Sequence, residues 1–357
     1  MKTAFLDITD KEYHGDKTAV GSSTLKSMLE NPIKGYKEHI NEIEVKKTEA
    51  LIFGGLIHTL VLEPDEFNNR YIVNDEYKEP KEELIVELEG LEVLQYPQEV
   101  LTPSGKLSTA KAKVALIEEL QADESKKYLT PEEYANYIIF KVCQETDKIV
   151  ISNKMYELAQ SVADKARSYE FQYTPTKGAE PFYFTLKDLE ANNIVKYEKA
   201  FYAYINPETL ETSLEEKEGY IKAKCKPDIM VELDEDVYLI YDLKTAVTAD
   251  PKEISVAGAK RYYPVQEALY TLILEANGLQ IPNFRFFIVG KEDWATAQDY
   301  EYDQPSKDLG KDLLKKALKL FDKAKKGEVK ETLFDATTGE YDREPIVTVP
   351  TYMFYNL

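Results

Sequence analysis

The residues best suited to chemistry in this sequence are Asp228, within Lys-Pro-Asp, and the Asp-Leu-Lys triplet that holds Asp242 and Lys244. Side chains on a strand alternate between its two faces, so Asp242 and Lys244 would point the same way. Asp228 precedes the neighbouring predicted strand, and a hairpin would bring its carboxylate beside that of Asp242. Two carboxylates suit a hard cation such as Mg²⁺, for which Mn²⁺ could substitute. The backbone carbonyl of Leu243 would add another oxygen ligand.

Lys244 supplies what a pair of metal-binding carboxylates lacks. Its ammonium could orient or acidify an attacking water and meet the negative charge that develops on a phosphate. Together these groups predict the hydrolysis of a phosphodiester. The alternative is a surface hairpin with an ordinary aspartate–lysine pair, because a D-x-K triplet by itself often arises by chance.

A helix predicted after these strands carries Gln266 and Tyr270, which lie four residues apart and therefore share one of its faces. That face could present Gln266 to the nucleophile or to a phosphate. The alternative is a helix that packs on the sheet through its leucines and leaves Gln266 exposed. Lys260 and Arg261, just before this helix, are the bases that we expect to contact DNA.

Two further residues could belong to the site, and each also has an ordinary structural interpretation. His58 lies in the apolar segment 50–62, where a single histidine is more often a satisfied core residue than a ligand. Glu180 precedes the β-rich part of the sequence and could hold a second metal ion or be a charge at a strand end.

The elements that must position these residues can be predicted from apolar spacing, capping residues and turn residues. Helices are predicted over 25–29, 50–62, 107–120, 131–144, 153–168, 263–277 and 307–325. Strands are predicted over 183–185, 196–204, 218–224, 229–233, 237–244 and 284–289, whereas residues 1–20 read as polar and turn-rich. This order predicts an α/β core in which a mixed central sheet is flanked by helices.

The domain organisation follows from length and from a change of character along the chain. With 357 residues, of which 43% are hydrophobic, the chain can bury a sizeable core as one large domain or two ordinary ones. Residues 75–175 alternate acidic, proline-bearing and Lys/Ala-rich pieces and are interpreted as a mostly helical insertion. Residues 180–290 would form the catalytic sheet and the helix after it, within a single domain of residues 1–357.

The composition limits the kind of protein that this is. A net charge of −20 speaks against a protein that coats nucleic acid, but not against an enzyme with a confined basic groove. Two cysteines, Cys143 and Cys225, cannot build a disulfide framework or a four-cysteine iron–sulfur site. We see neither an apolar run long enough to span a membrane nor a signal peptide, so we expect no membrane partner and a cytoplasmic location.

Taken together, these motifs resemble the nuclease domain of RecE (exonuclease VIII) and its phage-encoded relatives, in the RecB-like branch of the PD-(D/E)xK superfamily. The resemblance lies in separated segments that follow the family order: 8–14, 22–26, 31–32, 53–67, 70–73, 225–228, 242–245 and 263–270. Residues 75–175 show little of it. The resemblance implies a restriction-endonuclease-like core.

The resemblance also implies roles for the candidate residues. The metal-binding acids match Asp228 and Asp242, and a histidine close to the metal matches His58. Glu180 aligns loosely with a family glutamate. Lys244 matches the family's catalytic lysine, and Gln266 and Tyr270 match its Q-x-x-x-Y helix.

The activity that the resemblance implies is a Mg²⁺-dependent exonuclease that digests double-stranded DNA from its ends, 5′ to 3′. Its single-stranded product would pass to a phage single-strand annealing protein, and the enzyme could form a homo-oligomeric ring around DNA, in a bacterial host. A related endonuclease or single-strand exonuclease remains an alternative. So does a non-enzymatic DNA- or protein-binding module of the same fold, although every catalytic position is filled.

Overall fold

The computed structural model describes residues 5–43, 48–89, 131–175, 178–291 and 297–329. The chain divides into two compact units, one of Met1–Lys46 with Ser168–Leu357 and one of Lys47–Arg167. The helix predicted over 107–120 lies outside the described residues. Among the residues that are described, no helix is both long enough and apolar enough to cross a membrane.

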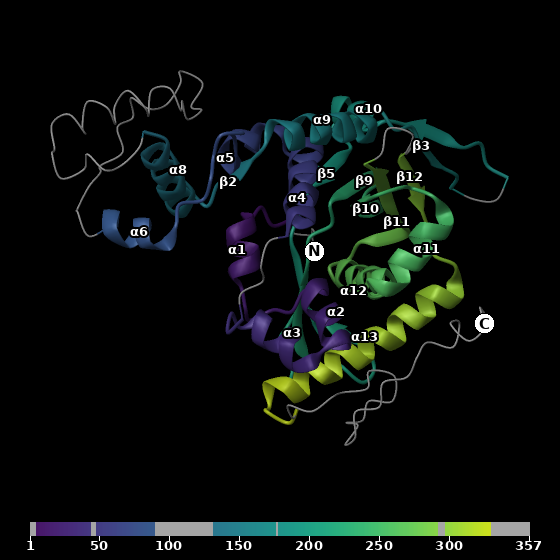
Figure 1. The fold of residues 1–357 in the computed structure, drawn as a ribbon. Coiled ribbons are helices and arrows are strands. Elements are labelled where there is room, and N and C mark those ends of the chain that lie inside the picture. The colour runs from purple at the N-terminus through teal and green to yellow at the C-terminus, as the bar shows by residue number, and fades with distance from the viewer. Residues whose placement is uncertain (1–4, 44–47, 90–130, 176–177, 292–296, 330–357) are drawn as a thin grey trace, which may run out of the picture. The chain divides into compact units, whose positions relative to one another are not determined.

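A five-stranded mixed sheet in the order β12-β11-β10-β9-β5 forms the centre of the first unit (Figure 1). Its strands are β5 (Val195–Tyr197), β9 (Ile229–Asp234), β10 (Val237–Ala246), β11 (Gln280–Gly290) and β12 (Ala297–Tyr300). Only β10 and β11 pair in parallel, and the other pairs are antiparallel. A parallel pair needs a crossover, which here contains α11 (Pro251–Lys260) and α12 (Tyr263–Ala276). The predicted α/β fold, with a mixed central sheet and flanking helices, is confirmed.

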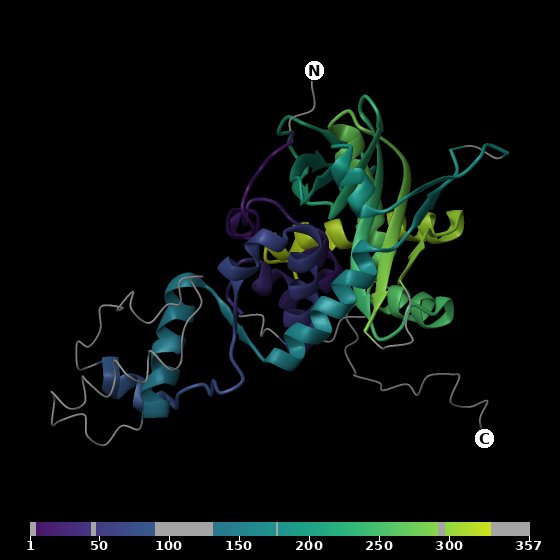
Figure 2. The same cartoon turned by 90° about the horizontal axis from the view of Figure 1, so that it is seen from above.

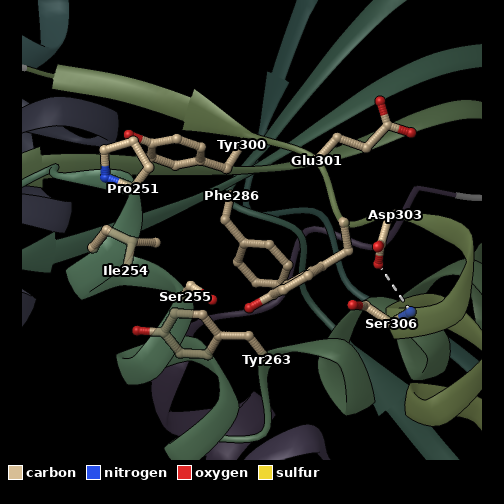
Figure 3. A pocket seen from close by; sticks show the side chains of 10 residues that line it. Pro251, Ile254, Ser255, Tyr263, Phe286, Tyr300, Glu301, Asp303 and Ser306 are labelled. Atoms are coloured by element: carbon tan, nitrogen blue, oxygen red, sulfur yellow. Dashed lines mark hydrogen bonds between the residues drawn. The ribbon is translucent and has the colours of Figure 1, made fainter.

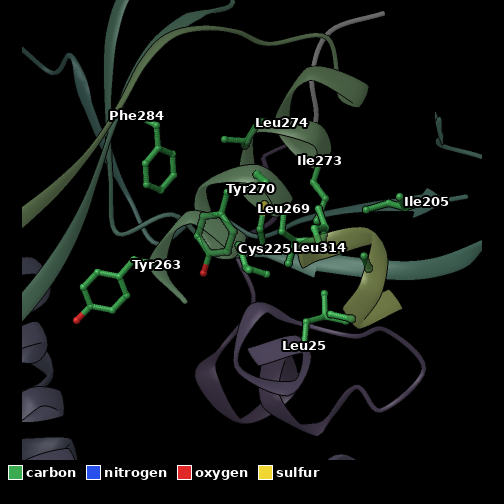
Figure 4. Close-up of a cluster of buried hydrophobic side chains, with 14 of the residues drawn as sticks. Leu25, Ile205, Cys225, Tyr263, Leu269, Tyr270, Ile273, Leu274, Phe284 and Leu314 are labelled. Carbon is green, nitrogen blue, oxygen red and sulfur yellow. The ribbon is translucent and has the colours of Figure 1, made fainter. Parts of the chain in front are cut away.

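The alternation of side chains gives this sheet two differently packed faces. On one face Ile240 and Phe284 join a core with Leu269 of α12 and Leu314 of α13 (Gln304–Lys325), part of which is drawn in Figure 4. On the opposite face the rings of Tyr241 and Phe287 contact Phe171 of β3 (Phe171–Tyr173). Strand β3 pairs with β4 (Phe182–Phe184) in a separate two-stranded sheet.

The segment predicted as one strand over 196–204 is two strands that belong to different sheets. After β5 the backbone of Glu198 takes a φ of 47°, in the left-handed region, and this turn ends the strand. The chain then enters β6 (Phe201–Ile205), which lies between β7 (Thr212–Ser213) and β8 (Ile221–Cys225) in a three-stranded sheet.

Helices cover the rest of the first unit. The N-terminal segment forms α1 (Asp10–Gly15), α2 (Ser22–Glu30) and α3 (Pro32–His39), and α10 (Leu186–Ala191) precedes β5. Residues 1–20, predicted as polar and turn-rich, include the short helix α1, whose first turn is stabilised by a capping box between Thr9 and Glu12. Asn31 ends α2 and caps α3, in which Pro32 takes the first position, where a proline costs no hydrogen bond.

The second unit is mostly helical. Its elements are α4 (Glu49–Leu62), η1 (Pro64–Glu66), α5 (Phe67–Arg70), β1 (Tyr71–Val73), α6 (Glu82–Glu89), α8 (Pro131–Thr146), β2 (Ile149–Ile151) and α9 (Asn153–Arg167). Strands β1 and β2 pair in parallel, and Arg167 of α9 donates a hydrogen bond to the carbonyl of Val61 in α4 at 2.7 Å. This unit begins before residue 75, so it includes the apolar helix that carries His58. The division of the chain into a catalytic core and an insertion stays a prediction.

Candidate active site

The hairpin of β9 and β10 brings the predicted acids together. In its antiparallel register the last pair is Tyr241 with Ile229, so Asp242 and Asp228 lie next to this pair at the same end of the ladder. Lys244 follows two residues after Asp242 and points to the same face of β10. Both acids are buried: the exposed fraction is 1% for Asp242 and 8% for Asp228.

Short contacts hold each carboxylate in place. The backbone N–H of Leu243 donates to Oδ2 of Asp228 at 2.6 Å. Nε2 of Gln266 donates to Oδ1 of Asp242 at 2.6 Å, and Nζ of Lys244 forms an ion pair with Oδ2 of the same residue. Four of the predicted site residues and the backbone of Leu243 therefore meet at one end of β9 and β10.

The charges of this cluster do not balance. Burial, and then repulsion by Asp242, raises the pKa of Asp228 well above its usual range, even though Lys244 acts in the opposite sense. Burial disfavours the charged form of Lys244, but attraction by Asp242 and Asp228 outweighs it and raises the pKa of the lysine. Lys244 thus forms an ion pair with Asp242 and acts on Asp228 electrostatically, while the ammonium of Lys26 is held by Gln266. A donor set of oxygens with surplus negative charge fits a divalent cation such as Mg²⁺.

Helix α12 supplies Gln266 and Tyr270 from one face. Gln266 is only 4% exposed, which rules out the alternative of an exposed glutamine on a helix that serves packing alone. Tyr270, one turn later, belongs to the hydrophobic core (Figure 4), and burial raises the pKa of its hydroxyl well above the usual range. Gln266 therefore acts on Asp242 directly, whereas the tyrosine is embedded behind it.

Lys26 of α2 is a site residue to which the sequence analysis gave no role. Its Nζ donates to Oε1 of Gln266 at 2.9 Å. The ring of Tyr263 lies near both lysines, with its centroid 5.9 Å from Nζ of Lys26 and 5.8 Å from Nζ of Lys244. Burial and the charge of Lys244 lower the pKa of Lys26 to about 8. The signal in the sequence was the family resemblance of segment 22–26, which ends at this lysine.

Glu198, at the end of β5, is a second residue that sequence reasoning missed. Its carboxylate lies within 4.8 Å of that of Asp228, and its backbone N–H donates to the carbonyl of Asp228 at 3.3 Å. Nζ of Lys226 donates to Glu198 at 2.7 Å and to Asp10 at 2.5 Å. Glu180, the acid that the sequence suggested as a further metal ligand, is exposed and precedes β4, a strand outside the central sheet. No signal in the sequence pointed to Glu198, because it lies inside the segment 196–204, which was predicted as one continuous strand.

The remaining candidates lie in three different settings. Lys260 is exposed at the end of α11. Arg261 is exposed as well, but its Nη1 donates to the hydroxyl of Tyr263 at 3.3 Å, which joins it to the ring beside Lys26 and Lys244. His58 is half-buried on α4 of the second unit, and its place near the metal stays a prediction.

No family model matches the sequence, and the search of curated proteins found no match. Among solved structures, the chain is similar to a provisionally named exonuclease from Eubacterium rectale at 15% identity, over 96% of this chain and 97% of that one, with a TM-score of 0.43. It is also similar to a structure named SSO0001 at 10% identity, over 67% of this chain and 85% of that one, with a TM-score of 0.22. Both likenesses are weak, so the function is inferred from the site alone.

Proposed function

We propose that this chain is a metal-dependent deoxyribonuclease with a PD-(D/E)xK core. The observation that carries the proposal is the meeting of Asp228, Asp242 and Lys244 in one buried cluster with surplus negative charge. A surface hairpin would leave these three side chains in water, where a pair of carboxylates costs little. Burying them together without a cation is unfavourable, so a site of this kind is built to bind one.

In the proposed reaction Asp228, Asp242 and the carbonyl of Leu243 hold the metal. When bound, Mg²⁺ supplies charge that stabilises the reacting phosphate and lowers the pKa of a coordinated water. Gln266 fixes the rotamer of Asp242 through its hydrogen bond, and Lys26 in turn fixes Gln266. Lys244 orients the attacking water and faces the negative charge that forms on the phosphate oxygens.

The proposed substrate is double-stranded DNA, which the enzyme digests from an end, 5′ to 3′. The chain as a whole carries a net charge of −20, so DNA has to be held by a confined set of bases. Lys26, Lys244 and Arg261 gather around the ring of Tyr263 beside the two acids, and they provide such a set. A single-strand annealing protein as the recipient of the product, and a ring of identical subunits, belong to the same proposal.

Digestion of end-labelled linear duplex beside covalently closed circles tests the proposal. We expect Mg²⁺ or Mn²⁺ to support loss of the linear duplex, while EDTA abolishes it and closed circles survive. Release of the label as mononucleotide from a 5′-labelled strand, before release from a 3′-labelled one, gives the direction. Persistent digestion in excess EDTA would contradict the metal-dependent mechanism. Rapid nicking of closed circles would identify an endonuclease instead.

A further inference from the structure

A cavity of about 320 Å³ lies among α11, β11, β12 and the start of α13 (Figure 3). Its size is at the lower end of the range for small-ligand pockets, roughly 300–1,000 Å³. Its lining includes four aromatic rings, those of Tyr263, Phe286, Tyr300 and Tyr302. None of the roles proposed above uses this cavity.

The rings form rigid walls suited to a flat ligand. Tyr263 and Phe286 stack with centroids 5.0 Å apart and planes 11° from parallel, and Tyr302 meets Phe286 edge-on at 5.6 Å. The hydroxyl of Tyr302 packs so closely against Gly258 of α11 that a Cβ there would lie 2.1 Å from it. Tyr300 is fixed by a hydrogen bond from its hydroxyl to the carbonyl of Ala249 at 2.5 Å.

The cavity adjoins the metal-binding acids on the same face of the central sheet. Asp242 is paired with Phe286 across β10 and β11, and Phe286 is paired with Tyr300 across β11 and β12. Neighbouring strands lie about 4.8 Å apart, so one ring wall is a single strand away from Asp242. Tyr263, which stacks on Phe286, also lies near both Lys26 and Lys244.

The polar groups at the cavity are acceptors and hydroxyls, from Ser255, Glu301, Asp303 and Ser306 (Figure 3). Asp303 uses Oδ1 to cap α13 through the N–H of Ser306 at 3.0 Å, and Glu301 pairs with Lys307 at 2.7 Å. Carboxylates at the rim repel a phosphate, but they accept hydrogen bonds from ring N–H and amino groups. The matching ligand is therefore a neutral, flat, donor-bearing ring.

We infer that this cavity receives one unpaired nucleobase of the DNA strand, next to the nucleotide that is being cleaved. The inference rests on the proposed nuclease function and adds a base-binding subsite to it. Stacking on aromatic side chains binds any base, because every base has a π-face, and each base carries an amino group or a ring N–H that can donate to the carboxylate rim. The phosphates on either side of the base stay outside, near Lys26 and Arg261.

The test measures kcat/KM for Mg²⁺-dependent digestion of duplexes that carry one abasic site at successive positions near the digested end. Ser255→Trp fills the cavity from α11, and Val256→Trp, at the next residue, is the matched control because Val256 is 54% exposed and does not line the cavity. Both substitutions lie at exposed positions of the helix, and a thermal melt of each variant checks that it folds.

We expect the wild-type enzyme to lose roughly 5- to 150-fold in kcat/KM when the abasic site falls at one particular position. Ser255→Trp should lower kcat/KM on intact duplex by a similar factor and remove the dependence on position, while Val256→Trp behaves as wild type. A flat abasic scan with efficient digestion, or equal behaviour of the two tryptophan variants, would overturn the subsite alone. Absence of Mg²⁺-dependent digestion on every substrate would overturn the nuclease function and the subsite together.

Discussion

The two faces of the central sheet each bury an aspartate, Asp242 on β10 and Asp299 on β12. Asp242 faces α12 and is 1% exposed, and Asp299, which pairs with Phe287, lies on the opposite face and is 5% exposed. The two acids are therefore distinguished by the groups around them and not by their burial.

Asp299 is paired with a permanent cation. The guanidinium of Arg285 forms an ion pair with it, and the hydroxyl of Tyr169 donates to its Oδ1 at 2.6 Å. Because arginine stays protonated, Asp299 keeps a cation beside it at any ordinary pH, and Glu301, 3.8 Å from the same guanidinium, has Lys307 as a further partner. Such a network specifies how β11, β12 and the segment before β3 pack.

Asp242, in contrast, lies beside a second buried acid, Asp228. It shares Lys244 with Asp228, and repulsion between the acids helps to raise the pKa of Asp228. Glu198 adds a third acid close to Asp228, although Lys226 pairs with it. The difference teaches that a binding site is marked by a buried surplus of one charge, and not by a buried acid as such.

The largest expected effect separates the two aspartates by catalysis. Asp242→Asn should lower duplex digestion by at least about 10³-fold, because losing a metal ligand removes several kcal/mol of charge stabilisation from the transition state. Asp299→Asn should change digestion by less than about tenfold, since this residue touches no reacting group. Initial rates at saturating Mg²⁺ measure both, and equal losses would show that the two acids do not differ in the way proposed.

The second effect concerns stability on the structural face. Arg285→Ala leaves Asp299 buried without its cation and should lower the free energy of unfolding by roughly 3–5 kcal/mol. Adding Mg²⁺ should not restore this loss, because this face binds no metal in the proposal. The double variant Arg285→Met with Asp299→Asn is the control, and it should recover most of the lost stability. Denaturant melts measure the series, and an Arg285→Ala variant as stable as the wild type would contradict the comparison.

The third effect is a dependence on pH. The raised pKa of Asp228 means that the folded state keeps a proton that the unfolded state loses, so metal-free stability should fall as pH rises from about 4 through the folded pKa. Mg²⁺ needs the ionised carboxylate, so its stabilisation should grow over the same range, to about 2.7 kcal/mol at 100 times Kd.

Thermal melts with and without Mg²⁺ between pH 5 and 8 measure this growth. Asp228→Asn should abolish it, because the amide does not titrate, while Asp299→Asn should leave it intact. A stabilisation by Mg²⁺ that stays constant across this range would mean that Asp228 is not a ligand.

The smallest effect concerns Lys26, whose pKa is lowered to about 8 by burial and by Lys244. Its positive charge is present below that pH and is lost above it, so DNA affinity should fall between pH 7 and 9 by roughly tenfold or less, as expected for one phosphate contact. Lys26→Gln should bind weakly at both values. Lys323→Gln, at an exposed position on α13, is the matched control and should keep the pH dependence, as fluorescence anisotropy on labelled duplex can show.

The sequence by itself determined the elements on which the proposed chemistry depends. Strands were predicted over 229–233 and 237–244, and the structure has β9 and β10 there; the helix predicted over 263–277 is α12. These patterns are local, because the pleat of a strand and the turn of a helix repeat within a few residues. That Asp242 and Lys244 share a face follows from the pleat alone.

Short or interrupted elements were harder to predict. Helix α11 has Asp250 as its N-cap and Pro251 at its first position, but most of its side chains are exposed, so little apolar periodicity marks it. The strand predicted over 196–204 breaks at Glu198 because its backbone turns into the left-handed region, which a propensity pattern does not reveal.

Only the tertiary structure decided which distant side chains meet at the acids. Lys26 reaches Gln266 across 240 residues of sequence, and Glu198, not Glu180, lies beside Asp228. The first contact depends on the hydrophobic core that packs α2 against α12, and the second depends on the pairing of β5 with β9. Periodicity indicates which face of an element is buried. It does not indicate which other element covers that face, because apolar burial is non-directional and many partners could satisfy it.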